Sequence, residues 1–156
     1  QPRTEGARSG TGALTICLLD ASGTPQAAFG IGNTGHCFIQ QFGKTVAAAS
    51  EIVERDTTYL LLAKLAAQDS SNPHSADRLS LAWYADPKQV PCDRSQIRWL
   101  LTGDSSTNLD STIPSIRIAA AAGLDWHIDG LRIGTAFDAV IVHTGMAVPR
   151  VPGHSH

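Results

Sequence analysis

Three glutamates are the first residues of this chain that could do acid–base chemistry. Glu5 stands in a start rich in Gly, Arg, Ser and Thr, whereas Glu51 and Glu54 are three positions apart. A glycoside hydrolase needs two carboxylates that flank one bond, and one of them must have a raised pKa. Strand residues three apart point to opposite faces. The spacing therefore predicts no catalytic residue at Glu51 and Glu54.

Nucleophilic chemistry has equally few candidates. The chain contains no Gly-x-Ser-x-Gly turn, and His36 and Cys37 are adjacent, so on a strand they point apart. The spacing of the three cysteines, Cys17, Cys37 and Cys92, fits no zinc template of paired Cys-x-x-Cys units. Cys17 and Cys37 lie in apolar runs and are predicted to be buried small hydrophobes. A Cys17–Cys37 disulfide is the alternative, and it would require both side chains to point to one face.

One polar loop could hold a metal ion. Residues 103–110 offer Asp104, Asn108 and Asp110, and Ca²⁺ prefers such carboxylate and amide oxygens. Asp69 and Asn72 offer a second set. The competing interpretation is that these residues end strands and form Asx-turns. The histidines near the end, at positions 143, 154 and 156, are typical of a solvated tail.

Three tryptophans could present an aromatic face to the apolar face of a sugar ring. Alternation around Trp83 predicts that its side chain faces the core. Trp99 and Trp126 are the two candidate ligand-binding residues, although burial is the commoner fate of tryptophan.

Composition narrows the class of protein. The chain has 156 residues, which suits one domain with a sizeable core, and its 42% apolar and 17% charged residues are typical of a globular protein. A formal net charge of -2 gives no reason to expect nucleic acid as a partner. No apolar run is long enough to cross a bilayer, so we expect no membrane insertion.

Short alternating or apolar segments separated by turn residues predict an all-β fold. The expected strands are residues 14–18, 27–31, 36–39, 58–65, 77–84, 96–101 and 115–120, and residues 102–112 are expected to form a loop. In the clearest of them, Leu79, Leu81 and Trp83 are predicted to face inward, and Arg78, Ser80 and Ala82 outward. Ile116 and Ile118 are likewise expected inward.

Residues 59–67 could also form a helix, because Leu, Ala and Lys favour helix. The preceding threonines favour a strand. In that strand Tyr59, Leu61, Ala63 and Leu65 would face the core. Leu60 and Leu62 would point to the opposite face of the sheet, which we expect to be partly covered.

The most informative stretch is the closing segment Trp126-His-Ile-Asp-Gly-Leu-Arg-Ile-Gly-Thr-Ala-Phe-Asp-Ala-Val140. Trp126 and Ile128 share one alternating register, and Leu131 and Ile133 share the other. Gly130 stands where the parity changes, as a β-bulge with a special backbone conformation would require. We therefore expect a strand, a kink and a second strand here.

Several sequence segments, in the order in which they occur along the chain, resemble the laminin-G-like (concanavalin A-like) sandwich domains of bacterial surface and secreted proteins. They are Thr57-Thr-Tyr-Leu-Leu-Leu-Ala-Lys64, Asp77-Arg-Leu-Ser-Leu-Ala-Trp-Tyr-Ala-Asp-Pro87, Ile113-Pro-Ser-Ile-Arg-Ile118 and the closing stretch, where family members commonly carry Ile-Asp-Glu-Leu-Arg-Ile-Gly-Thr. This chain has Gly130 in place of the usual acidic residue. The resemblance implies an antiparallel jelly-roll sandwich over residues 13–143, lacking its first strands, with a flexible segment at 1–12 and a tail or linker at 144–156.

The resemblance also implies a role. We expect a non-catalytic recognition or adhesion module of a secreted or cell-surface protein, with a glycan or a surface protein as ligand and calcium as the cofactor many such sandwiches hold. The alternative is a structural spacer or assembly subunit that self-associates through an open sheet edge near residues 14–18. A glycoside hydrolase-like enzyme is the third hypothesis.

Overall fold

The computed structural model describes residues 14–54, 56–66, 77–104, 109, 113–121, 126–135 and 140–141. In these ranges the regular elements are eight β-strands and two single-turn 3₁₀ helices. They are β1 (Leu14–Leu19), β2 (Pro25–Ile31), β3 (His36–Gln41), β4 (Lys44–Ile52), β5 (Leu60–Ala66), β6 (Arg78–Tyr84), η1 (Pro87–Gln89), η2 (Arg94–Gln96), β7 (Leu101–Asp104) and β8 (Ser115–Ala120). The predicted all-β class is confirmed. The segments expected at 1–12 and 144–156 lie outside the described residues.

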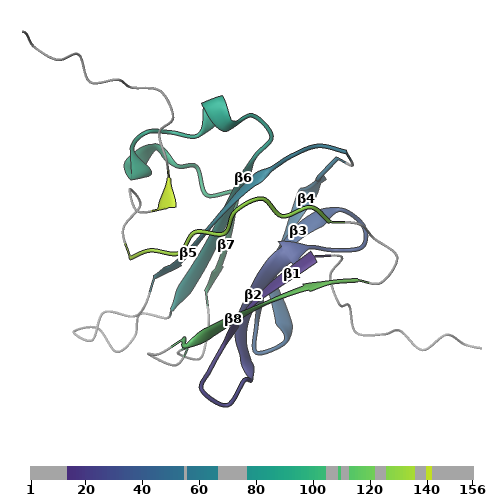
Figure 1. The fold of residues 1–156 in the computed structure, drawn as a ribbon, viewed down its shortest axis with the longest axis vertical. Helices are drawn as coiled ribbons and strands as arrows, with labels where there is room; N and C mark the ends of the chain where they lie inside the picture. The colour runs from purple at the N-terminus through teal and green to yellow at the C-terminus, as the bar shows by residue number, and fades with distance from the viewer. Residues whose placement is uncertain are drawn as a thin grey trace, which may run out of the picture.

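The strands form two antiparallel sheets that lie as two layers (Figure 1). One sheet has the order β4-β3-β2-β1-β8 and the other β5-β6-β7, an arrangement consistent with a β-sandwich. β1 pairs with β2 on one side and with β8 on the other. The expectation of an open edge at residues 14–18 is therefore wrong, because β8 returns to cover that edge.

The core lies between the two sheets. Its largest fully buried side chains are Ile39 and Cys37 from β3 and Leu79 and Leu81 from β6. Alternation along each strand supplies one inward side chain every second residue. The same cluster contains further buried side chains from β1, β2, β7 and the connections: Leu18, Ala27, Phe29, Ile31, Val53, Leu101 and Leu109.

Residues 60–66 form a strand, which excludes the helical alternative for 59–67. As the strand pattern predicts, Tyr59, Leu61 and Leu65 pack against the central core, whereas Ala63 is exposed, contrary to expectation. Leu62 is buried on the opposite face of this sheet. This agrees with the expectation that this face is partly covered.

The outward face of β6 is covered, which the alternation did not predict. Ala82 is fully buried and Ser80 nearly so, although both were expected to face solvent. The long connection between β6 and β7 folds back and places Ile97 against Leu62 and Ala82 in a second apolar cluster. Leu79, Leu81 and Trp83 face the main core as predicted.

The strand predicted at residues 96–101 is displaced toward the C-terminus. Asp93 caps η2, since its side chain accepts a hydrogen bond from the Ser95 N–H at 2.8 Å. Ile97 then turns into the outer cluster, and the ladder with β6 covers only Leu101 to Asp104. Residues 102–104, expected to be loop, are therefore strand.

β4 is a strand that the sequence pattern does not predict. Its centre is Ala47-Ala-Ala-Ser50, and alanine has low β-propensity and little contrast between faces. β3 nonetheless pairs with it, with two shifts of register. Pairing with a buried neighbour therefore outweighs local preference here.

β8 is a strand as expected, but its inward face is only partly covered. Ile116 packs against the central core, whereas Ile118, also predicted inward, is 39% exposed. β8 is the edge of the five-stranded sheet, and the opposite sheet has only three strands. The narrower layer explains why its inner face is not fully buried.

The closing stretch departs most from expectation. Residues 126–135 belong to neither strand ladder, and they run as a plain extended trace in Figure 1. The predicted strand, kink and strand is therefore wrong. The special conformation predicted at Gly130 is confirmed, because its φ of +82° lies in the left-handed region.

The closeness of β1 and β2 gives the first prediction. Gly30 lies opposite Thr15, and a Cβ there would overlap the backbone carbonyl of Leu14. Because a backbone pair in mid-sheet cannot move aside, Gly30→Ala is expected to cost about 3 kcal/mol of unfolding free energy or more, measured by urea denaturation. Gly32→Ala, whose nearest neighbour would be the His36 carbonyl at 3.5 Å, is the control and should change it by less than about 0.5 kcal/mol. Equal effects of the two variants would contradict this packing.

Candidate functional site

The glutamates do not form an enclosed pair. Glu51 lies in β4 and Glu54 follows it, and both residues are exposed. The backbone N–H of Glu54 donates to the Tyr59 hydroxyl at 3.1 Å. A general acid of a hydrolase needs burial or a neighbouring charge to raise its pKa. Glu51 and Glu54 are not buried, and Glu5 lies outside the described residues.

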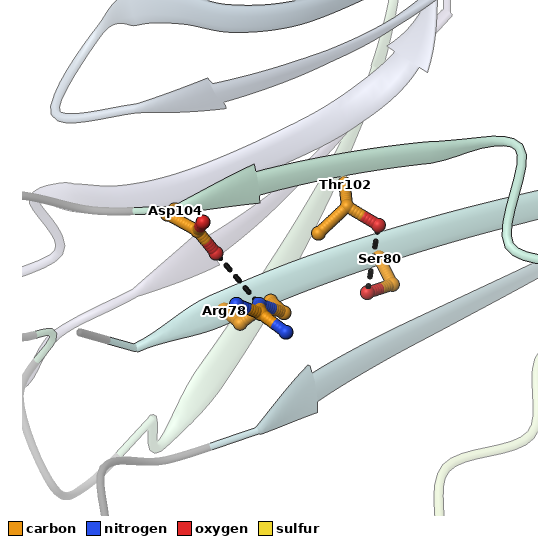
Figure 2. A network of polar contacts seen from close by, with 4 residues as sticks. All are labelled: Arg78, Ser80, Thr102 and Asp104. Carbon is orange, nitrogen blue, oxygen red and sulfur yellow. Dashed lines mark hydrogen bonds and ion pairs between the residues drawn. The ribbon is translucent and has the colours of Figure 1, made fainter. Parts of the chain in front are cut away.

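Asp104, the first calcium candidate, is engaged with a neighbouring strand. Its Oδ1 accepts a hydrogen bond from Arg78 Nε at 2.6 Å, and the two residues are direct cross-strand partners (Figure 2). This bond raises the pKa of Arg78. Ser80 and Thr102 are the next cross-strand pair on the same face, and a hydrogen bond of 3.4 Å links their hydroxyl groups. The contacts are those of a cross-strand ladder on a sheet face.

The other calcium candidates cannot be placed. Asn108 and Asp110, and also Asp69 and Asn72, lie outside the described residues. In the described ranges, no group of three or more His, Cys, Asp or Glu side chains is arranged to hold a metal ion. Calcium therefore stays a prediction.

Asp20 illustrates what the polar turns of this fold do. Its Oδ1 accepts hydrogen bonds from the Ser22 N–H and the Thr24 N–H, each at 2.8 Å, and from Ser22 Oγ at 2.6 Å. Gln26 Nε2 donates to Oδ2 at 2.9 Å. The Ser22 hydroxyl and these other donors lower the pKa of Asp20. The carboxylate thus closes the β1–β2 turn, as an Asx-turn does.

The cysteines do not form a disulfide or a catalytic pair. Cys17, Cys37 and Cys92 are free thiols. Cys37 lies in the central core, whereas Cys17 packs with Leu19 and Ala28 in a separate cluster. The predicted burial of Cys17 and Cys37 is confirmed, and the alternative of a bridge between them is wrong. The ring Nδ1 of His36 lies 3.3 Å from the Glu51 carbonyl, and His36 and Cys37 point to opposite faces of β3.

The three tryptophans have three different environments. Trp83 packs against the central core, as predicted. Trp99 is partly buried against the outer cluster of Leu62, Ala82 and Ile97. Trp126 is 37% exposed on the extended stretch after β8. Of the two ligand-binding candidates, Trp126 is therefore the more exposed residue.

Trp126 belongs to a larger exposed surface, which we name the apolar strip. Its members are Trp126, Ile128, Leu131 and Ile133, with exposed fractions of 37%, 46%, 51% and 70%. Four large apolar side chains within eight residues form an unusual solvent-facing group, since scattered single residues are the norm. The apolar strip is the candidate functional site.

The sequence located this stretch but not its exposure. The pattern of apolar residues suggested a strand that buries one face, and alternation has the same appearance whether the face meets a core or a ligand. Only the absence of a ladder partner in the described part of the chain distinguishes the two.

Comparisons with protein-family models, with curated proteins and with solved structures found no match to this chain. Across the described ranges, no helix has the length and apolar character needed to span a membrane.

Asp77 gives a prediction about how the β7–β8 connection is held. Asp77 is 4% exposed, and its Oδ2 accepts a hydrogen bond from the Leu109 N–H at 2.6 Å. Asp77→Ala would leave this buried N–H unpaired, so the unfolding free energy should fall by about 1–3 kcal/mol in urea titrations. Asp104→Ala removes an exposed carboxylate of the same sheet and should leave the midpoint near that of the parent. A larger loss for Asp104→Ala than for Asp77→Ala would refute the assignment.

The cysteine environments give a second prediction, testable with a thiol reagent at pH 8. Burial raises the pKa of Cys37 to about 12, from an ordinary value of 9.0. The folded state therefore favours the protonated thiol, and its contribution to stability is present below pH 9 and lost as the pH rises toward 12. One thiol, that of exposed Cys92, should react rapidly in the native protein, and all three in urea. Cys92→Ser should abolish the rapid phase. A rapid phase that survives this substitution would count against the buried environments.

Proposed function

We propose that this chain is a non-catalytic recognition module of laminin-G-like, jelly-roll type, which binds a glycan or a surface protein through the apolar strip. The single observation that carries the proposal is the exposure of Trp126, Ile128, Leu131 and Ile133 together on one extended stretch. A folded domain gains stability by burying such side chains, so a contiguous exposed group is typical of a binding surface.

The scaffold supports this role. Two sheets bury an apolar core that contains Ile39, Leu79 and Leu81, whereas the apolar strip is exposed. A rigid sandwich that displays a recognition surface on a connecting segment follows a common division between scaffold and site.

The nature of the side chains supports a glycan as the first ligand to test. Trp126 presents a solvent-facing indole ring, and aromatic rings pack against the apolar face of a pyranose. His127, Asp129 and Arg132 alternate with the apolar residues and are exposed, so they offer hydrogen-bonding groups to hydroxyls beside the ring. A surface protein is the second ligand class, because tryptophan and arginine are also enriched where proteins bind one another.

The non-catalytic assignment rests on the placement of the acidic groups. Glu51 and Glu54 face solvent, and Asp20, Asp77 and Asp104 are each engaged by hydrogen bonds from neighbouring residues. An exported or cell-surface location and a role for calcium follow from the family resemblance, and they form part of the same proposal.

A glycan array, run with and without a calcium chelator, tests the proposed function. The protein is expected to bind a subset of glycans, and Trp126→Ala should weaken that binding at least about tenfold, because a tryptophan at the centre of a contact commonly dominates its energy. Trp99→Phe, at a tryptophan that is partly buried elsewhere, is the matched control and should retain affinity. Circular dichroism of both variants establishes that they fold.

Absence of binding to any sugar under either condition would contradict the glycan form of the proposal. Equal losses for Trp126→Ala and Trp99→Phe would place the site elsewhere on the molecule. Loss of binding on chelation alone would support the predicted calcium.

A further inference from the structure

The apolar strip is exposed along its whole length and contains one left-handed residue. Trp126 and Ile128 alternate with His127 and Asp129, and Gly130, at φ +82°, stands between this run and Leu131 and Ile133. A left-handed glycine is what the first position of a G1 bulge requires when a strand pairs with a partner. On pairing, such a bulge would bring Leu131 and Ile133 to the face of Trp126 and Ile128.

The backbone of this stretch is available for pairing. In the described part of the chain, residues 126–135 take part in neither sheet and in none of the backbone hydrogen bonds outside the sheets. With a sugar or an apolar surface as ligand, these backbone N–H and C=O groups would keep their hydrogen bonds to water. An added strand would instead form backbone hydrogen bonds with them. The occupant that fits the backbone is therefore another extended chain.

The charges of the stretch are complementary to themselves. Asp129 and Arg132 stand on either side of the Gly130–Leu131 step, at equal distance from its centre. If two copies pair antiparallel about this centre, Asp129 of each lies opposite Arg132 of the other, and Ile128 lies opposite Ile133. Opposite charges in direct cross-strand positions stabilise a pair, and like charges destabilise it.

A bulge at Gly130 would make this register compatible with two-fold symmetry. Directly opposite residues of antiparallel strands point to the same face, so in a symmetric pair positions 128 and 133 must share a face within one copy. They are five positions apart, and a regular strand would place them on opposite faces. A bulge at the left-handed Gly130 would remove that conflict.

We propose that residues 126–135 pair antiparallel with the same segment of a second copy of this chain. This inference rests on the proposed function, because the dimer would hold both sets of Trp126, Ile128, Leu131 and Ile133 on one face. That face remains open to a ligand, and two linked sites raise the avidity for a repeating glycan. The second copy thus completes a bivalent binding surface.

Sedimentation equilibrium without any ligand tests the pairing. The protein is expected to show a monomer–dimer equilibrium. Asp129→Arg should raise the dissociation constant at least about tenfold by placing like charges opposite each other. The double variant Asp129→Arg with Arg132→Asp restores opposite charges and should return the constant to within about threefold of the parent. Glu54→Arg makes the same change in net charge at another exposed position and should leave the equilibrium unaltered.

The outcomes separate this inference from the proposed function. A monomer at every concentration up to about 1 mM overturns the pairing, even when glycans bind. A dimer that ignores both the reversal and its rescue also overturns it, because another surface must then hold the copies together. A dimer that responds as expected but binds no glycan supports the pairing and counts against the glycan ligand.

Discussion

The burial of two inner sheet faces against each other is the interaction on which the rest of this structure depends. Ile39 and Cys37 from one sheet, and Leu79 and Leu81 from the other, are removed from water almost completely. Each large apolar side chain buried in this way contributes about 1.5–3 kcal/mol. This packing also determines the strand register, because a slip of one residue would turn every inward side chain to solvent.

The unequal widths of the two sheets determine what is left at the surface. Three strands cannot cover five, so the inner face of β8 is exposed at Ile118. The smaller sheet has its outer face covered instead by the β6–β7 connection, which buries Ala82 and Leu62 beneath Ile97. The extended stretch after β8 then carries the largest concentration of exposed apolar side chains. The proposed binding surface lies on this stretch.

Much of the sheet structure could be predicted from local pattern. The alternation over residues 77–84 predicts both the strand and its inward residues, and the break in alternation at Gly130 predicts its special backbone conformation. The failures have one cause. The alanine run of β4 gives no difference in hydrophobicity between the two faces of the strand, and β7 begins only where the chain pairs with β6. In both cases the partner strand determines where the strand forms. For the candidate site, the pattern found Trp126 but could not tell an exposed apolar face from a buried one.

The amino-acid sequence by itself determined the all-β class, the inward face of β6 and the left-handed glycine. These properties depend on neighbouring residues and on the period of two along a strand. Only the tertiary structure decided that β8 covers β1, that Ser80 and Ala82 are buried, and that the apolar strip lies outside both sheets. Each of these depends on contacts between residues far apart in the chain, and the same alternating sequence is compatible with a buried or an exposed outcome until those partners are in place.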